Sequence, residues 1–457
     1  MMGCVLCLAW SLALASPPTT DRPERPLTFR EALAVAREQN GQLRASEEQV
    51  QRAQASREEK RGLYFPTVSA LGAYGHMNDR LFVDLNGVRP YLQALNPAVP
   101  LPPLTATVLD QDPFRLSLLA RWTVFTGGRI VAANRAAEAG VTAASQQQLE
   151  TEHALVTEVA TRYFGRRLAA DVLEVRRASL ETLTRHLEDA RRLKREGQIA
   201  RTDELRAEVA RAEAERDFKK AGRDVELASV ALASSLGADM NVIPTTPLAF
   251  VKGLEPRESF AETAPGNPSI QRLGALRLEA HEGVAAARGE IWPTVILYGT
   301  YELVDSGLNS TADPKWIVGV LGRWELFDGL ARYNRRKEAQ HLEAALASEQ
   351  SWAQQNVGTL VQQRYDEYQS ALEQYESLET TQALAQESLR AETKAFEAGV
   401  GTSLAVVDAQ LALSRVQVGR LTALRDLDVA LAQLLEASAQ SDRLADYVER
   451  ATPGGQP

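Results

Sequence analysis

Tyr64-Phe65-Pro66-Thr67-Val68 returns later in the chain as Ile291-Trp292-Pro293-Thr294-Val295. The two prolines lie 293 − 66 = 227 residues apart, and the same offset carries Asn40 onto Asn267. The segment between the Asn and the Pro therefore has one length in both halves. An internal repeat of this size indicates that the chain consists of two copies of one structural unit.

A second pair of motifs keeps a different offset. Arg121-Trp122-x-x-Phe125-x-Gly127 recurs as Arg323-Trp324-x-x-Phe327-x-Gly329, at 324 − 122 = 202. The offset of 202 still relates Gly197 to Gly399, far along the chain. The two offsets differ by 227 − 202 = 25 residues, which form an excess loop in the first copy, rich in Pro and Asn and centred on Asn86 to Thr105.

Composition restricts the class of protein. The chain has 457 residues, 6% aromatic residues and a net charge of −9, and its basic residues are interleaved with acidic ones. Binding to nucleic acid needs Lys and Arg clustered on one face, so nucleic acid is not an expected partner. The low aromatic content and the abundance of Ala, Gln, Glu and Arg favour long solvated coiled helices over a compact aromatic core.

The first 15 residues are typical of an export signal. An apolar run from Val5 ends in Ala13-Leu14-Ala15, the small-x-small form that precedes a cleavage site, although no Lys or Arg precedes the run. We predict a signal peptide over residues 1–15 and a mature chain that starts near Ser16. Cys4 and Cys7 lie inside this signal, so the mature chain is expected to hold no thiol, disulfide or Cys metal site.

The sequence predicts membrane contact through strands. Beyond the signal, no apolar run reaches the roughly 18 residues that a membrane helix requires. The stretch from Phe114 to Phe125 alternates, with one apolar face that includes Trp122 and a second face that carries Arg115 and Arg121. The stretch from Trp316 to Leu326 repeats this alternation.

The pattern in each half therefore predicts one hairpin with strands of about 10 to 12 residues, over residues 67–125 in the first half and 294–327 in the second. The predicted strand entries and exits are Pro66, Phe125, Pro293 and Phe327. Four strands cannot close a barrel, and open edges are not viable in hydrocarbon, so a membrane location requires several chains. Two chains would supply about eight strands and three about 12, the latter with a lumen wide enough for water. A soluble antiparallel sheet is the alternative.

Two long stretches without Pro follow the hairpins, over residues 128–237 and 329–437. Apolar residues between Leu404 and Leu434 recur at spacings of three, four and seven, as in a coiled coil. At about 1.5 Å per residue, the longer helix would reach roughly 100 Å. We therefore predict a helical rod.

Both long stretches are interrupted at equivalent points, by Gly197 and by Gly399. Each glycine is followed by a residue that can cap a new helix, Thr202 or Thr402. We predict that the chain turns back at both points and that the two turns form the tip of the rod.

The order of helix, hairpin and long helical hairpin, twice over, resembles the TolC-like outer-membrane efflux protein family (outer membrane factors) across essentially the whole mature chain. The residues that carry the resemblance are Leu27 to Leu33, Asn40 to Leu43, Phe65-Pro66, Trp292-Pro293, Phe125, Phe327-Asp328-Gly329, Ala398-Gly399-Val400 and Val407 to Gln410. The resemblance implies a mainly α fold with membrane β: a duplicated helix, β-hairpin and long helical-hairpin unit, a trimeric β-barrel of about 12 strands, and an α-helical coiled-coil tunnel that continues it. On this basis the first repeat covers residues 16–245, the second 246–440, and residues 441–457 form a periplasmic C-terminal tail.

The implied function is that of the outer-membrane channel of a tripartite efflux or type I secretion system in a Gram-negative cell. Such a channel is a homotrimer in the outer membrane lipid that passively conducts substrates. The implied partners are a periplasmic adaptor protein and an inner-membrane transporter. The resemblance makes Gly197, Gly399, Val400 and Thr402 the expected adaptor-contacting turns.

The resemblance also implies a periplasmic gate. Asp408 matches a family position where an acidic residue lines the closed aperture, and threefold symmetry would place three carboxylates on one ring. The family often has a second Asp one turn earlier, where this chain has Ala405. Asp203, at the equivalent position of the first repeat, is the expected replacement. Alternatively, Asp408 is a solvated helix residue without a role in gating.

No pattern predicts catalysis, a cofactor or a metal site. The five His residues have no metal-ligand spacing, and Gly127-Gly128 after a strand lacks the Lys of a phosphate-binding loop. The chain is therefore not expected to be an enzyme. Two other functions stay open: an exported coiled coil that tethers envelope layers, which leaves the alternating strands unexplained, and a self-sufficient porin, which leaves the long helices unexplained.

Overall fold

The computed structural model describes residues 23–98, 100–109, 111–305 and 315–454. The predicted signal peptide and both cysteines lie outside the described residues. The chain divides into two compact units. The helical unit comprises residues 1–47, 147–270 and 352–457, and the sheet unit comprises residues 48–146 and 271–351. None of the described helices is both long enough and apolar enough to cross a membrane.

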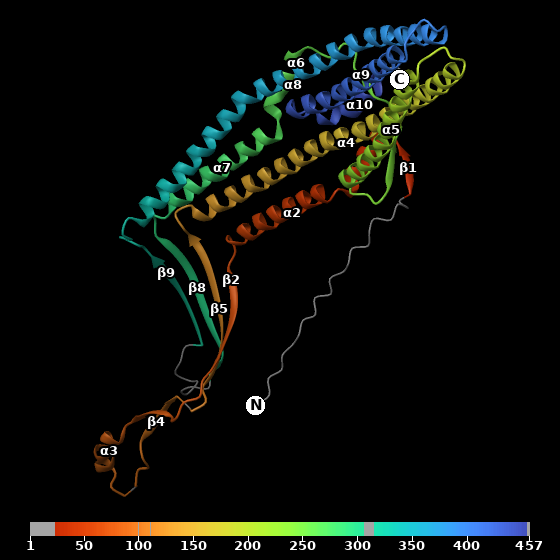
Figure 1. The fold of residues 1–457 in the computed structure, drawn as a ribbon. Helices are drawn as coiled ribbons and strands as arrows, with labels where there is room; N and C mark the ends of the chain where they lie inside the picture. The colour runs from red at the N-terminus through yellow and green to blue at the C-terminus, as the bar shows by residue number, and fades with distance from the viewer. Residues whose placement is uncertain (1–22, 99, 110, 306–314, 455–457) are drawn as a thin grey trace, which may run out of the picture. The chain divides into compact units, whose positions relative to one another are not determined.

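The long helices repeat with the offset that the sequence shows. α4 (Arg129–Arg195) and α8 (Ala331–Glu397) each have 67 residues, and their starts differ by 331 − 129 = 202. α5 (Arg201–Leu236) and α9 (Ser403–Ala437) start at the same offset, 403 − 201 = 202. α4 and α5 form one helical hairpin and α8 and α9 form a second (Figure 1). The duplicated fold predicted from the sequence is confirmed at this level.

Shorter elements precede each hairpin. α2 (Gly41–Gly62) and α7 (Pro268–Gly289) each have 22 residues and differ by 268 − 41 = 227. α1 (Phe29–Gln39) begins at a capping box, in which the Thr28 hydroxyl accepts from the amide of Glu31 and the Glu31 carboxylate accepts from that of Thr28. The remaining elements of this part are β1 (Glu24–Leu27), which pairs in parallel with β6 (Asn241–Pro244), the helix α6 (Arg257–Thr263) and the 3-10 turn η2 (Ala264–Gly266).

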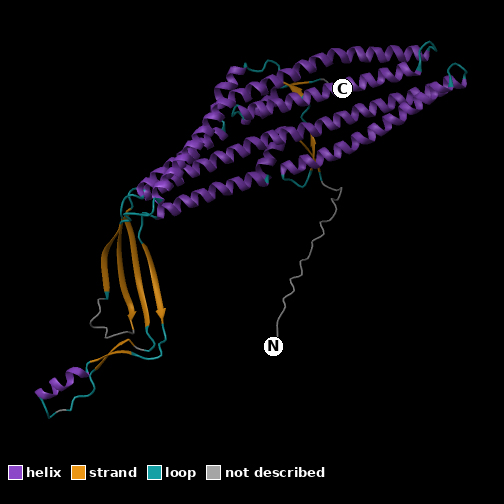
Figure 2. Cartoon of the chain, turned by 60° about the vertical axis from the view of Figure 1, so that its left-hand side comes forward, coloured by secondary structure: helices purple, strands orange, loops and turns teal. Residues whose placement is uncertain are grey.

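Four strands of the sheet unit form an antiparallel sheet in the order β2-β5-β8-β9 (Figure 2). β5 (Phe114–Phe125) and β8 (Thr294–Asp305) have 12 residues each, as predicted. β2 (Thr67–Tyr74) and β9 (Trp316–Arg323) have only 8 each, fewer than predicted. Among the described residues, β2 pairs only with β5 and β9 only with β8. Both outer edges of this sheet therefore expose backbone N–H and C=O groups.

The register of this sheet gathers apolar side chains on one face. Trp122 lies opposite Leu297, and Leu118 lies between Ala70 and Tyr301. This apolar face consists of Val68, Ala70, Gly72, Leu116, Leu118, Ala120, Trp122, Leu297, Gly299, Tyr301, Trp316, Val318 and Val320. The other face carries Arg115, Arg121 and Glu302. No residue of the apolar face is charged, and Val318, Val68 and Trp316 are 73%, 69% and 65% exposed, so the part of the chain that the structure describes leaves these side chains uncovered.

The predicted excess loop of the first hairpin is structured. It contains β3 (Leu81–Asp84) paired antiparallel with β4 (Thr105–Leu109), the 3-10 turn η1 (Asn86–Val88) and the helix α3 (Arg89–Leu95). Pro90 is compatible with α3 because it stands in the first turn of this helix, where its missing N–H has no partner to lose. Leu95 is 83% exposed and Tyr91 is 76% exposed, so these apolar side chains of the excess loop are not buried within it.

Replacing residues 86–104 with a two-residue Asn-Gly turn should leave the four-stranded sheet intact. The turn would join Leu85 directly to Thr105, where β3 and β4 already pair through Asp84 and Thr105. We expect a change of less than about 1 kcal/mol in the free energy of unfolding, because the removed side chains are mostly exposed. Light scattering in detergent would then give the same number of chains per particle as the wild type. A smaller number of chains per particle would mean that the excess loop packs between subunits.

The repeated Trp and Pro motifs meet where the strands join the helices. The indole N–H of Trp122 donates to the carbonyl of Tyr64 at 2.9 Å, and that of Trp324 donates to the carbonyl of Ile291 at 3.1 Å. Each accepting carbonyl lies two residues before the proline that precedes β2 or β8. One hydrogen bond thus ties the end of each hairpin to its beginning, which explains why both motifs occur in both copies.

Pro66 and Pro293 stand directly before β2 and β8, and Phe125 is the last residue of β5. Phe327 differs from its predicted role, because β9 already ends at Arg323. Arg323 pairs with Thr294, the first residue of β8, so no strand partner is left for the residues after it. Phe125, in contrast, lies opposite Val295 of β8.

The helical unit has an aromatic core. Phe29, Tyr163 and Phe164 are at most 1% exposed, and their ring centroids lie 5.3 to 5.6 Å apart. The Tyr163 hydroxyl donates to the carbonyl of Leu27 at 2.7 Å and accepts from the amide of Thr246 at 3.0 Å. The expectation that no compact aromatic core is needed was wrong for this unit, since the segments before and between the repeats fold against the long helices and bury these three aromatic residues together.

The second repeat anchors its connecting segment in the same manner. The Tyr368 hydroxyl on α8 donates to the carbonyl of Val251 and accepts from its amide, at 3.0 and 3.1 Å. Burial raises the pKa of Tyr368 to about 12. Asp428 on α9 is only 4% exposed, and burial raises the pKa of its carboxyl well above the usual range. One of its carboxyl oxygens accepts from the amide of Ala249 at 3.5 Å.

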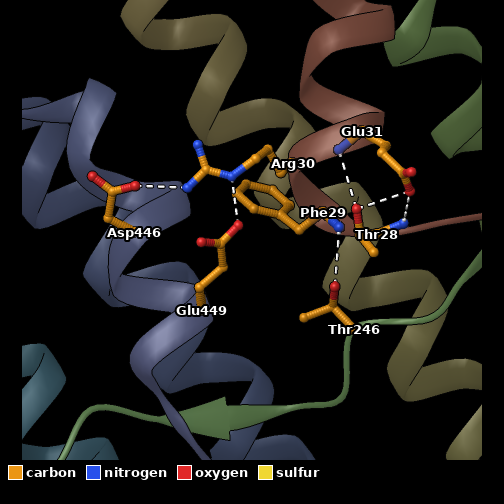
Figure 3. Close-up of polar contacts among 7 residues, drawn as sticks. All are labelled: Thr28, Phe29, Arg30, Glu31, Thr246, Asp446 and Glu449. Atoms are coloured by element: carbon orange, nitrogen blue, oxygen red, sulfur yellow. Dashed lines mark hydrogen bonds and ion pairs between the residues drawn. The ribbon is translucent and has the colours of Figure 1, made fainter.

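The end of the described chain is folded onto the helical unit. It forms the 3-10 turn η3 (Ser441–Arg443), α10 (Leu444–Arg450) and β10 (Thr452–Pro453), which pairs with β7 (Ala249–Phe250). The Arg30 guanidinium bonds to Asp446 at 2.6 Å and to Glu449 at 2.5 Å (Figure 3). Residues 441–454 of the predicted periplasmic C-terminal tail are thus folded, and the location of this segment stays a prediction. Leu444 and Tyr447 are at most 1% exposed, so the segment completes the core.

Candidate functional site at the helical tips

The two turns predicted at Gly197 and Gly399 have the same geometry. Both glycines have a φ of +76°, in the left-handed region that favours glycine. At the first turn the amide of Gln198 donates to the carbonyl of Leu193, and at the second the amide of Val400 donates to that of Ala395. This is the hydrogen-bond pattern of a Schellman motif, which ends α4 and α8 and reverses the chain. Residues 195–201 and 397–403 are called the first and the second tip below.

The helix starts after the two tips differ. Thr402 caps α9, since its hydroxyl accepts from the amide of Ala405 at 3.2 Å. Thr202 does not cap α5, because the N-cap position belongs to Ala200 and Thr202 already lies inside the helix. The prediction of a second threonine cap was therefore wrong. An Ala at the N-cap leaves first-turn amides without a side-chain acceptor, so the first tip is stabilised by other contacts.

An ionic cluster stabilises the first tip. The Glu204 carboxylate accepts from Lys194 at 2.5 Å and from Arg201, and Arg191 lies 3.9 Å away. These hydrogen bonds, that from Lys194 first, lower the pKa of Glu204. Glu204 is 8% exposed, so its carboxylate is nearly enclosed by the basic side chains. The cluster joins the last turn of α4 to the first turn of α5.

Apolar side chains stabilise the second tip. Phe396 and Val406 occupy the positions of Lys194 and Glu204, at 396 − 194 = 202 and 406 − 204 = 202, and both are 1% exposed. They belong to one cluster with residues of the first hairpin, namely Leu187, Ala190, Leu193 and Ala207. The two tips thus pack against each other, and Val400 at the second turn stays 82% exposed.

The two predicted gate carboxylates have different surroundings. Asp408 lies on α9 beyond the second tip and is exposed. Asp203 lies in the first turn of α5, where its carboxylate is 3.6 Å from the guanidinium of Arg206. Arg206 occupies the position of Asp408 in the first repeat, at 408 − 206 = 202. Asp203 therefore has a basic partner on its own helix, and its role as a replacement for the carboxylate that Ala405 lacks stays a prediction.

One contact at the tips had no signal in the sequence. Nε2 of His186 on α4 lies 2.9 Å from the hydroxyl oxygen of Ser403, the first residue of α9. The two residues are 217 positions apart and belong to different repeats. A lone His in a charged helix gives no spacing from which its partner can be read. Within the described part of the chain, no group of three or more His, Cys, Asp or Glu side chains could hold a metal ion.

Comparison with known proteins assigns these features to a family. The family model described as "Outer membrane efflux protein" matches residues 32–238 and 262–440, which is most of the chain and both repeats. The chain belongs to the outer membrane efflux protein family. The resemblance predicted from the repeat is thereby confirmed. Members of the family are outer-membrane efflux channels. The search of curated proteins finds no match.

Several solved members of the outer membrane efflux family share the fold. VceC of Vibrio cholerae has a TM-score of 0.74 at 15% identity, covering 90% of this chain and 95% of that one. MtrE of Neisseria gonorrhoeae has 0.73 at 20% identity, with coverages of 90% and 89%. CmeC of Campylobacter jejuni has 0.75 at 11% identity, with coverages of 93% and 90%. At sequence identities of 11% to 20%, the similarity to these structures shows a shared fold and nothing more.

Proposed function

We propose that this chain is the outer-membrane channel of a tripartite efflux or type I secretion system, which passively conducts substrates delivered by an inner-membrane pump and a periplasmic adaptor. The observation that carries the proposal is the four-stranded sheet with one uncharged apolar face and two open edges. An uncharged apolar face is suited to contact with lipid. At an open edge in hydrocarbon, however, each unpaired backbone N–H or C=O group costs on the order of several kcal/mol, as other buried polar groups without a partner do. The sheet must therefore be completed by other copies.

The strand directions allow closure by identical copies. β2 and β8 run one way and β5 and β9 the other. Pairing β9 of one copy with β2 of the next would keep the alternation, so a ring of copies would form an antiparallel barrel without edges. Three copies supply about 12 strands, which leaves a water-filled lumen. The face with Arg115, Arg121 and Glu302 would line this lumen.

The test of this proposal is the particle mass of protein extracted from membranes, measured by light scattering with detergent correction. Three chains per particle would support the shared barrel. A tethering coiled coil predicts a soluble monomer or dimer, and a self-sufficient porin predicts conduction by a single chain. Replacing Val318 in β9 by Pro would remove one ladder N–H and should abolish the trimer while leaving the helical unit folded.

The helical tips would form the periplasmic aperture and the adaptor contact. Threefold symmetry would bring three Asp408 side chains onto one ring, a negative ring that selects cations. Gly197, Gly399, Val400 and Thr402 would present the adaptor with two tips of different chemistry, one ionic and one apolar. The exposed Val400 side chain supports this assignment, because a large apolar side chain at a turn is available for a partner.

Asp408→Asn should raise the conductance and weaken the cation preference in planar bilayers. The substitution keeps the size of the side chain and removes its charge, so the ring no longer attracts cations or holds them in the aperture, and ions leave it faster. The matched control is Asp203→Asn, which removes a carboxylate already paired with Arg206 and should change selectivity little. An unchanged current-voltage relation in the Asp408 variant would remove this residue from the gate.

A further inference from the structure

The His186 side chain connects the two helical hairpins at the tips. Its ring lies on α4 of the first hairpin, 5% exposed. Nε2 is 2.9 Å from the hydroxyl oxygen of Ser403 on α9, and the ring centroid is 4.6 Å from that of Phe396 on α8. Ser403 is completely buried. One side chain therefore touches both helices of the second hairpin where they meet the turn.

The contact lies next to the predicted aperture. Ser403 follows the N-cap Thr402 directly, and Asp408 lies just over one helical turn further along the same helix. A second hydrogen bond between the hairpins, from Arg176 to the hydroxyl of Ser414 at 2.9 Å, is further from the tip. The His186 contact is thus placed to hold the first turn of α9, and with it Asp408, against the first hairpin.

The surroundings of His186 favour the neutral ring. Phe396, whose ring contacts that of His186, belongs to an apolar cluster with Leu187, Leu193 and Val406. The N-terminus of α9 carries a partial positive charge that repels a cation. Burial lowers the pKa of His186, and Asp189 on its own helix, already bound to Arg192 at 2.8 Å, opposes this only in part.

The charged groups on the neighbouring helices give His186 no counter-ion. On α5, Glu204 is bound by Lys194 and Arg201. On α9, the nearest carboxylate along the helix is the exposed Asp408. On α8, Lys394 and Glu397 flank Phe396 in the sequence, and their charges are opposite. A proton on the ring would therefore place a net positive charge in an apolar contact, which is unfavourable unless water enters.

We propose that His186 is a positioning residue of the aperture, a latch between the two hairpins that holds the tip of α9 while the ring is neutral and releases it on protonation. The proposal rests on the proposed channel function. Either neutral tautomer can bond to the Ser403 hydroxyl without bringing a charge into the contact, whereas the protonated ring carries a full positive charge into it. Hydration of the imidazolium then separates the second tip from the first hairpin.

The sign of the pH dependence follows from the lowered pKa. The unfolded ring takes up a proton near pH 6.5, whereas the folded ring takes it up only at lower pH. The latch therefore contributes fully above the unfolded pKa, and its contribution falls as the pH decreases from there through the folded value. The aperture should open on acidification of the side that faces the tips.

Two measurements on the full-length channel test the latch. In planar bilayers, lowering the pH on the tip side from about 7.5 to about 5.5 should raise the wild-type conductance several-fold. His186→Gln keeps a hydrogen-bonding side chain that does not titrate, and it should lose this rise. In parallel, amide exchange of residues 396–408, corrected for its intrinsic pH dependence, should increase on acidification in the wild type and not in His186→Gln.

A control and a second variant complete the experiment. His341→Gln replaces an exposed histidine of α8 and should keep the full wild-type response. Ser403→Ala retains the titrating ring but removes its partner, so amide exchange at the tip should already be raised at neutral pH. An identical pH response in His186→Gln and wild type overturns the latch. A different outcome separates the two proposals. If acid increases amide exchange only when His186 is present, but neither the wild type nor any variant conducts, the channel function is overturned and the latch is kept.

Discussion

Gly127→Ala should destabilise the sheet unit far more than Gly128→Ala. Both glycines have positive φ, +65° and +87°, so an alanine at either position adds about 1 to 3 kcal/mol of backbone strain. A Cβ on Gly127 would also lie 2.5 Å from the carbonyl oxygen of Gly289 and 2.6 Å from Cβ of Trp292, whereas one on Gly128 would meet nothing within 4 Å. This overpacking adds about 1 to 3 kcal/mol at Gly127 alone.

The expected loss at Gly127 has a structural consequence for assembly. Gly127 follows β5 and faces the end of α7 just before β8, where the two repeats approach each other. Shifting this junction would disturb the pairing of β5 with β8, the central pair of the sheet. We expect the Gly127 variant to unfold at lower denaturant concentration and to yield fewer trimers in detergent. Equal losses of stability for the two alanine variants would show that backbone strain at positive φ causes the loss, and not the close approach of Gly127 to Gly289 and Trp292.

Phe29→Ala should reduce the free energy of unfolding of the helical unit by about 3 to 5 kcal/mol, the usual range for a buried Phe. The Phe29 ring is 1% exposed and stacks on Phe164 at 5.3 Å, with Tyr163 edge-on at 5.6 Å. Its removal leaves a cavity that the surrounding long helices cannot easily fill. Its backbone amide also donates to the Thr246 hydroxyl, which positions the segment between the repeats (Figure 3).

Urea denaturation followed by circular dichroism measures this loss. Phe29→Leu is the matched control, because it keeps most of the apolar volume and should cost clearly less than the alanine variant. A loss below about 1 kcal/mol for Phe29→Ala would mean that the aromatic cluster is not the main source of stability in this unit. The ion pairs of Arg30 with Asp446 and Glu449 would not explain the stability of this unit either, because exposed ion pairs contribute little to the free energy of unfolding.

The elements that the sequence predicted correctly depend on local patterns. Alternation over Phe114 to Phe125 predicted β5 and its apolar face, since side chains alternate with period two in any strand. Glycines at the tips predicted both turns, because the left-handed conformation there strongly favours glycine. The repeat offset then transferred each assignment to the second copy.

Two predictions from local patterns failed. By the offset of 202, Thr402 corresponds to Ala200 and not to Thr202, so only Thr402 is a cap, while Glu204 and its basic partners hold the first tip. β9 stops at Arg323 because its neighbour β8 starts at Thr294. The pairing of Arg323 with Thr294 joins two segments, and no spacing within one of them encodes it.

The sequence by itself determined the duplication, the order of strands and long helices, the apolar face and the family, because repeats and periodic patterns are properties of the chain. Only the tertiary structure decided that Phe29, Tyr163 and Phe164 gather in one core, that residues 441–454 complete it, and that His186 meets Ser403. The physical reason is that packing couples residues far apart in the chain, and the free energy of such a contact depends on the burial of both partners together.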